Sequence, residues 1–189
     1  MAKYKEEIKV LKEAQDVNEV IERYMLLLLG VVDRPIPSIL HLEKEMFIFS
    51  NFNPTVKKFV NFRSHYKGPY SQELQALVES PLYFTSAWEI EDGKIRLTEK
   101  GKILFKELVK LFENDEKFNR NMESLRLIRE IYDRLSPDEL LLLIYITYPE
   151  YGEKSKLFDR IQKRKEEIAR SLLRKGLITR KRYEEILKK

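Results

Sequence analysis

The 189-residue sequence contains no cysteine and only two histidines, His41 and His65. Without cysteine the chain forms no disulfide, has no thiolate nucleophile and offers no cysteine zinc site. Two histidines are too few for the usual ligand set of a zinc enzyme. We therefore expect no metal site and no bound cofactor, and we expect both histidines to be structural or surface residues.

Long apolar runs are also missing. The most apolar segment, residues 24–32, is far shorter than the ~20 residues that a membrane helix needs. The first residues, Met1–Glu7, lack the apolar core of a signal peptide. These absences predict a cytoplasmic protein with no membrane partner. With six Gly and seven Pro, long irregular stretches are not expected either.

Catalytic motifs are absent as well. There is no Gly-rich phosphate-binding loop and no Gly-x-Ser-x-Gly motif. Glu43 with Glu45, and Glu166 with Glu167, are close in sequence, but such neighbours on a helix do not face one cleft. We expect these carboxylates on a solvated surface and expect no enzymatic activity.

Charge is plentiful and unevenly spread. Residues 151–189 contain 14 Lys/Arg and 6 Asp/Glu, whereas residues 1–150 contain 22 and 25. A basic tail on a slightly acidic body predicts a localised surface for a polyanion, and a solvated helix surface is the alternative interpretation. Many Lys, Glu and Arg without Cys are typical of heat-adapted, thermophile-like proteins.

Apolar residues recur three and four positions apart along most of the chain, which predicts a mainly α protein. Capping residues mark the expected helix starts at Asp16, Ser38, Asn53, Ser71, Thr98 and Ser136. The expected helices cover about 3–14, 17–32, 38–49, 54–60, 72–79, 98–111, 125–131, 137–146, 153–175 and 179–187.

One β element is predicted. Ala87–Glu91 and Lys94–Leu97 flank Asp92-Gly93, a dipeptide typical of tight hairpins. Three short helices followed by a hairpin is the element order of a winged helix. The predicted fold is therefore mainly α with one small β-hairpin: a winged helix-turn-helix domain at 1–113 and an all-helical, basic C-terminal domain at 114–189.

The segment Leu97-Thr98-Glu99-Lys100-Gly101 resembles the Leu-Thr-x-x-Gly stretch found where many winged-helix proteins leave the second wing strand. We expect Leu97 to point into the core, Thr98 to cap a helix and Gly101 to allow close packing.

A second resemblance involves Leu42–Phe49, the stretch Phe62–Ser71 (Phe-Arg-Ser-His-Tyr-Lys-Gly-Pro-Tyr-Ser) and Glu73-Leu74. Over about residues 20–110 the chain resembles YwgA-like winged-helix proteins and, more distantly, Panacea-type antitoxin domains. The resemblance implies a winged-helix fold, a cytoplasmic location and a regulatory or antitoxin-like role. It implies no catalytic residue.

Aromatic residues are dense around these motifs, and we expect them mainly in the core: Phe47, Phe49, Phe52, Phe59, Phe62, Tyr66, Tyr70 and Trp88. We expect Gly68–Ser71 to form a rigid turn and a helix cap. A platform on which single-stranded bases stack is the alternative for segment 57–70.

Two functions fit these patterns. The first is a DNA-binding transcriptional regulator, because cations contact phosphates and polar side chains read base edges. Its expected nucleic-acid-binding residues are Arg63, Lys67, Ser71, Gln72, Gln75, Lys94, Arg96, Arg160, Arg164, Lys165, Arg174 and Lys175. The second is an antitoxin or adaptor module that binds a protein partner, since the expected third helix at 72–79 has no Lys or Arg. Either could form a homodimer through the N-terminal helix or Leu140–Ile146.

Overall fold

A computed structural model describes residues 16–153 and 155–188 and confirms the mainly α prediction, with 65% of the residues in helices. It contains two small antiparallel hairpins, where the sequence predicted one. The helix expected at 3–14 lies outside the described residues. Within the described part of the chain, no helix is both long enough and apolar enough to cross a membrane.

The chain divides into two compact units. Unit 1 takes in Met1–Asn61 and Ser71–Glu130, and unit 2 takes in Phe62–Tyr70 and Ile131–Lys189. These units differ from the expected domains 1–113 and 114–189, because contacts between distant segments define them. A short internal segment joins the C-terminal unit, and most of the helix after residue 114 joins unit 1.

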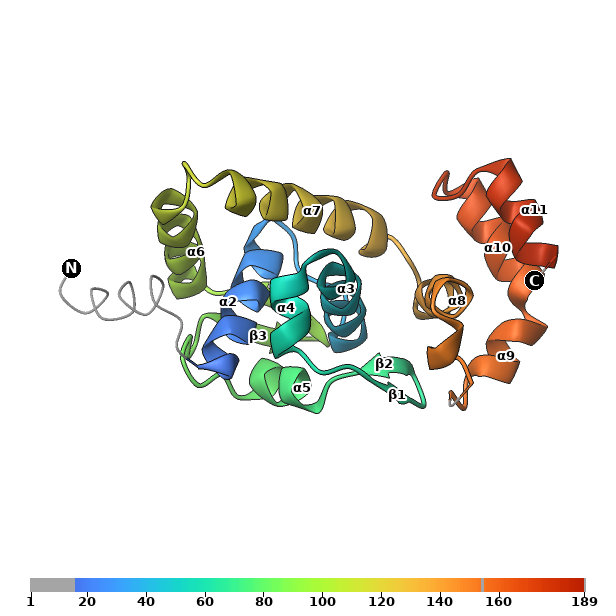
Figure 1. The fold of residues 1–189 in the computed structure, drawn as a ribbon, viewed down its shortest axis with the longest axis horizontal. Helices are drawn as coiled ribbons and strands as arrows, with labels where there is room; N and C mark the ends of the chain where they lie inside the picture. Colours follow the sequence, from blue (N-terminus) through green and yellow to red (C-terminus); the bar gives the residue numbers. More distant parts are fainter. Residues whose placement is uncertain (1–15, 154, 189) are drawn as a thin grey trace. The chain divides into compact units, whose positions relative to one another are not determined.

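Unit 1 is helical apart from one hairpin (Figure 1). Its elements are α2 (Val17–Gly30), α3 (Ile39–Phe52), α4 (Pro54–Phe59), α5 (Gln72–Glu79), β3 (Trp88–Glu91), β4 (Lys94–Leu97), α6 (Glu99–Leu111) and α7 (Glu116–Tyr132). The predicted caps are confirmed: each side chain accepts a backbone N–H of the first turn, which would otherwise lack a partner. These residues are Asp16, Ser38, Asn53, Ser71 and Thr98.

The core of unit 1 forms around α2, which lies against α4, α5 and α6 (Figure 1). Met25, Leu26 and Leu28 of α2 are fully buried. Gly30, at the end of this helix, lies so close to α6 that an added Cβ would come within 2.3 Å of the Phe105 ring. Because apolar burial contributes about 25 cal/mol per Å2, burial of the leucine run of α2 stabilises this unit.

Asp92 and Gly93 form the turn of the β3–β4 hairpin, as predicted, with φ angles of 50° and 75°. Left-handed values at both central residues belong to the type I′ turn, whose twist matches that of the strands. Ile36 adds a third extended segment. Its N–H donates to the Ile95 carbonyl at 2.8 Å, and the Ile95 N–H donates back at 3.0 Å.

Residues 97–101 behave as the sequence predicted. Leu97 is buried, and the Thr98 hydroxyl accepts the Gly101 N–H at 3.2 Å. The Thr98 backbone N–H also donates to the Ala87 carbonyl at 3.0 Å, which ties the start of α6 to the start of β3. Gly101 lies directly against that carbonyl: a Cβ there would be 1.9 Å from the Ala87 oxygen.

The segment between α5 and β3 is organised by one buried carboxylate. Both oxygens of the Glu22 carboxylate, which is fully buried, accept backbone N–H groups. The donors are Leu82 at 2.6 Å, Tyr83 at 3.0 Å and Phe84 at 2.8 Å. A loop with no regular structure thus has its backbone donors satisfied by a side chain about sixty residues earlier.

Two of the four expected surface carboxylates are buried instead. Glu43 and Glu45 are 6% and 0% exposed, so the prediction of a solvated pair on α3 is wrong. Their charge is compensated by buried cations: Lys44 Nζ lies 3.2 Å from Glu43, and Arg129 Nε lies 3.7 Å from Glu45. The other pair, Glu166 and Glu167, is exposed as expected.

Unit 2 combines a hairpin with helices. Its elements are β1 (Arg63–His65), β2 (Gly68–Tyr70), α8 (Pro137–Thr147), the 3-10 helix η2 (Pro149–Tyr151), α9 (Phe158–Lys163), α10 (Lys165–Arg174) and α11 (Arg180–Lys188). The sequence predicted only a turn at 68–71. Each strand is three residues long and β2 contains Pro69, which lacks a ladder donor. The strand pattern was therefore too short to recognise.

The prediction of one long helix at 153–175 is wrong. The backbone forms separate helices α9 and α10, and Arg164 between them has φ −105° and ψ 10°. Turns precede α9, where the Ser155 hydroxyl accepts the Leu157 N–H at 3.2 Å and donates to the Tyr66 carbonyl at 2.7 Å. These two hydrogen bonds of Ser155, one local and one to the distant Tyr66, hold residues 155–157 in a non-helical conformation.

The apolar helix α8 is a core element. Ser136 and Glu139 form the predicted capping box at its start. Six of the seven side chains of Leu140–Ile146 are buried within the single chain, so this segment has little apolar surface for a second copy. Its role in a homodimer stays a prediction. The other segment considered for a dimer, the N-terminal helix, lies outside the described residues.

Candidate nucleic-acid interface

Helix α5 was expected to present Ser71, Gln72 and Gln75 to DNA. Ser71 is fully buried. Its hydroxyl accepts the Leu74 N–H at 3.3 Å and donates to Glu73 at 3.1 Å, so it serves the helix cap. Gln75 donates to Glu79 within α5 at 3.0 Å, and Gln72 is exposed. The helix carries two carboxylates and no Lys or Arg, which is unfavourable for contact with phosphates.

The β3–β4 hairpin has little free positive charge. Arg96 is held by two carboxylates of the facing strand, Glu89 at 2.8 Å and Glu91 at 2.8 Å. The hydrogen bond to Glu89 is the main cause that raises the pKa of Arg96. Lys94 is exposed next to the turn and to Asp92. Of the two hairpin residues expected to contact DNA, only Lys94 has its charge free of a carboxylate partner.

In unit 2, the structure brings three of the expected cations to the start of α8. Arg160 and Arg164 reach the two oxygens of Asp138 at 2.5 Å and 2.6 Å. Lys175 reaches Glu139 at 2.6 Å. Arg160 and Arg164, together with their partner Asp138, line a cavity of about 550 Å3, which Arg174 also lines. The ion pairs link α9 and α10 to α8, so Arg160, Arg164 and Lys175 stabilise the unit.

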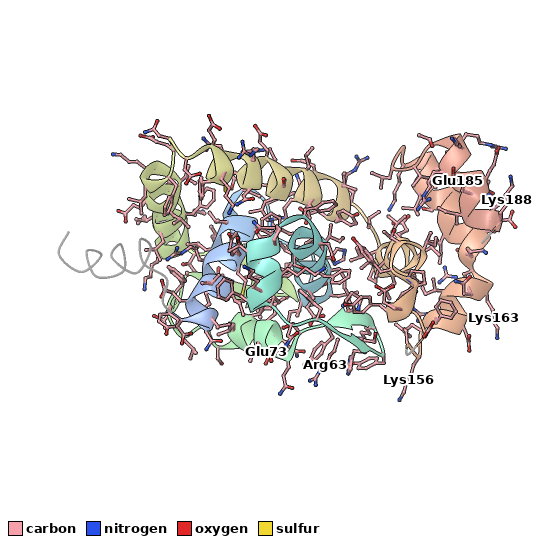
Figure 2. All side chains as sticks on the ribbon, in the orientation of Figure 1. Arg63, Glu73, Lys156, Lys163, Glu185 and Lys188 are labelled. Atoms are coloured by element: carbon pink, nitrogen blue, oxygen red, sulfur yellow. The ribbon has the colours of Figure 1, made fainter. Side chains whose placement is uncertain are left out.

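Other cations among residues 155–188 form no ion pair with a carboxylate in the part of the chain that the structure describes. These are Lys156, Lys163, Lys165, Arg174, Lys181 and Lys188. Figure 2 shows Lys156, Lys163 and Lys188 projecting outward from the unit. Lys165 and Arg174 were among the predicted site residues. They were identifiable from sequence, because no carboxylate lies three or four positions away on their helix.

Arg63 and Lys67 lie on the β1–β2 hairpin, where each is near an aromatic ring. The Arg63 guanidinium is 5.9 Å from the centre of the Tyr70 ring, and Lys67 Nζ is 5.5 Å from that of Tyr66. Tyr66 is 42% exposed, so the expectation that it belongs to the core is wrong; the same holds for Phe52, which is 70% exposed. Trp88, by contrast, is buried and donates to the Val78 carbonyl at 3.0 Å.

Glu139 is expected to make the stability of unit 2 depend on pH. Burial alone would raise its pKa, but hydrogen bonds from Lys175, Ser136 and Ser171 outweigh burial and lower the pKa. A lowered pKa in the folded state means that the carboxylate contributes stability above its ordinary pKa near 4.3 and loses it as the pH falls. Glu139→Gln should therefore lower the free energy of unfolding by about 1–2 kcal/mol at pH 7 and change it little near pH 3.

Thermal unfolding followed by circular dichroism at both pH values measures this effect. Glu167→Gln is the matched control, because Glu167 is 67% exposed and pairs with Arg164 in the same unit. Exposed pairs contribute about 0–1 kcal/mol. An equal loss for the two variants at neutral pH, or a Glu139→Gln loss that persists in acid, would contradict the assignment.

No protein-family model matches the chain, and no curated protein matches it. Among the described residues, no group of three or more Asp, Glu or His side chains is placed to hold a metal ion.

Proposed function

We propose that the chain is a nucleic-acid-binding protein, a DNA-binding transcriptional regulator, in which unit 1 is a winged helix. The order of α2, α3, α5 and the β3–β4 hairpin supports this assignment. So does the pairing of Ile36 with Ile95, a one-residue bridge that brings the segment between α2 and α3 against the hairpin. Here α4 and β1–β2 are inserted between the second and third of these helices.

The distribution of charge carries the proposal. Unit 2 contains 17 Lys/Arg and 10 Asp/Glu, and unit 1 contains 19 and 21. Six cations among residues 155–188 have no carboxylate partner, whereas α5 has no cation at all. Phosphate contacts supply most of the non-specific affinity for DNA. We therefore assign these contacts to unit 2, with Lys163, Lys165 and Arg174 as their centre, and leave α5 without a phosphate-binding role.

Charge reversal tests this assignment. Lys163→Glu, Lys165→Glu and Arg174→Glu in one chain should weaken binding to a labelled duplex by at least about tenfold. The slope of log affinity against log salt should fall by about 0.9 for each of these cations that contacts a phosphate. Fluorescence anisotropy between about 50 and 200 mM salt measures both quantities.

The matched control reverses three unit 1 lysines that also lack an ion-pair partner among the described residues: Lys106, Lys110 and Lys117. This variant has the same net charge as the test variant. If both variants lose the same affinity, only net charge matters and the surface assignment fails. If the test variant binds like the wild type, the phosphates contact another part of the chain.

A protein-binding module of antitoxin or adaptor type is the second candidate. It is favoured by the outward face of α5, where Glu73 and Glu79 are exposed, and by the nearby Leu82, which is 61% exposed. An acidic face beside an exposed apolar side chain suits a basic protein partner. The absence of salt-dependent duplex binding by the wild-type chain would favour this candidate. A homodimer stays part of either proposal, and sedimentation equilibrium of the full chain measures it.

A further inference from the structure

The β1–β2 hairpin has one face that packs within unit 2. Ser64 and Pro69 face each other across the strands. The Ser64 hydroxyl donates to the Glu150 carbonyl at 3.1 Å, and Pro69 is buried. The turn is anchored as well, because Ser155 donates to the Tyr66 carbonyl at 2.7 Å and contacts the Tyr145 hydroxyl at 2.6 Å. The hairpin is therefore held at its turn and along one face.

The opposite face carries a cation and two stacked rings. Because side chains alternate along a strand, Arg63 and His65 share this face, and Tyr70 lies opposite Arg63. The His65 and Tyr70 rings stack, with centroids 4.6 Å apart and planes inclined by 27°. The residue opposite His65 is Gly68, which has no side chain to cover the ring.

A third ring extends this surface around the turn. The Tyr66 ring lies 4.2 Å from His65, is tilted by 56° and is 42% exposed. A fully structural aromatic would bury most of its apolar area, since that burial is what stabilises a core. The exposure of Tyr66, in a turn that is held by hydrogen bonds, leaves a ring surface presented to solvent.

Positive charge surrounds these rings. Segment 62–70 contains Arg63 and Lys67 and no carboxylate. Lys156 follows Ser155, the residue that bonds to the turn, and forms no ion pair with a described carboxylate. Figure 2 shows Arg63 and Lys156 projecting outward near the hairpin. Stacked or exposed rings among cations are the chemistry of sites that hold single-stranded nucleic acid.

We infer that the open face of the β1–β2 hairpin binds unpaired nucleotides. Bases stack on Tyr66 and on the His65–Tyr70 pair, and the adjacent phosphates contact Arg63, Lys67 and Lys156. The inference rests on the proposed nucleic-acid binding and specifies it further. Unit 2 then has two contact surfaces: a cationic one for phosphates of any strand, and this hairpin for exposed bases.

Anisotropy with a labelled oligothymidine of about 12 nucleotides tests the inference in the full chain. Stacking of one base contributes about 1–3 kcal/mol to binding. Tyr66→Ala should therefore lower the affinity for this probe about 5- to 150-fold. Its affinity for duplex should stay unchanged, and Tyr66→Phe should restore binding of the single strand. An abasic oligomer of equal length should bind the wild type at least as weakly as oligothymidine binds Tyr66→Ala, because it lacks the bases at both stacking positions.

Tyr183→Ala is the matched control, because Tyr183 of α11 also carries a cation, with Arg180 5.6 Å from its ring centre. It should bind oligothymidine like the wild type. Equal affinity of the wild type for abasic and thymidine oligomers would overturn the inference, whatever the folding of the alanine variant. If the wild type binds neither duplex nor single strand, the proposed function itself fails. If duplex binding is intact but thymidine and abasic oligomers bind equally well, only the hairpin's role is ruled out and the proposed function stands.

Discussion

Gly101→Ala is expected to destabilise unit 1 by about 3 kcal/mol or more, at the upper end of overpacking costs. The new Cβ would lie 1.9 Å from the Ala87 carbonyl oxygen and 2.8 Å from its carbon. That carbonyl has little freedom to move, because it accepts the Thr98 N–H at 3.0 Å and lies 3.2 Å from the Thr98 hydroxyl. The clash therefore requires separation of α6 from the start of β3.

Denaturant unfolding followed by tryptophan fluorescence measures this loss. Trp88 is the only tryptophan of the chain, it is buried, and it follows Ala87 directly. Gly93→Ala is the control in the same hairpin: its φ is 75°, but an added Cβ meets nothing within 4 Å. That variant should lose only about 1–2 kcal/mol from backbone strain. Similar losses for the two variants would show that the contact at Gly101 is not as close as described.

Arg129→Met is expected to lower the free energy of unfolding by about 3–5 kcal/mol, because removing one partner of a buried ion pair leaves the other charge buried without compensation. Arg129 is fully buried. Its guanidinium donates to the Leu28 carbonyl at 2.7 Å and to the Arg34 carbonyl at 2.7 Å, and it lies 3.7 Å from Glu45. The substitution removes donors from the Leu28 carbonyl in α2 and from the Arg34 carbonyl after that helix, and it leaves a buried carboxylate without this cation.

The Arg129 variant is also measured by Trp88 fluorescence during denaturant unfolding. Arg126→Met is its control, because Arg126 is exposed on the same helix and should change stability by no more than about 0.5 kcal/mol. Adding Glu45→Gln to Arg129→Met should recover part of the loss, since the uncompensated charge is then removed. If the double variant is as unstable as the sum of the single variants, the two residues do not interact.

Local signals in the sequence predicted much of unit 1. Asp92-Gly93 predicted a hairpin because two left-handed residues are needed there. Capping residues such as Ser38 predicted helix starts because their side chains satisfy donors only two or three residues away. Gly101 was expected to allow close packing, and it does. The partner in that contact, the Ala87 carbonyl, could not be identified from a local pattern.

The candidate site was predicted only in part. Lys165 and Arg174 could be identified from the sequence as cations without an ion pair on their own helix, because no carboxylate lies three or four positions away. Arg160 could not be separated from them, since it also has no carboxylate at helical spacing and its partner Asp138 lies 22 residues earlier in the chain. The Tyr70 ring was expected in the core, and its stacking on His65 depends on a strand register that two three-residue strands do not reveal.

The amino-acid pattern alone was enough for helix starts, the β3–β4 turn, the mainly α class and the excess of positive charge near the C-terminus. Each of these depends on interactions within a few residues or on composition. The tertiary structure decided which charges are buried, which cations keep a free charge, and that segment 62–70 joins the C-terminal unit. These outcomes depend on contacts such as that between Arg129 and Leu28, 101 residues apart. Sequence periodicity reports which face of a helix is apolar, but it does not report which distant group will meet that face.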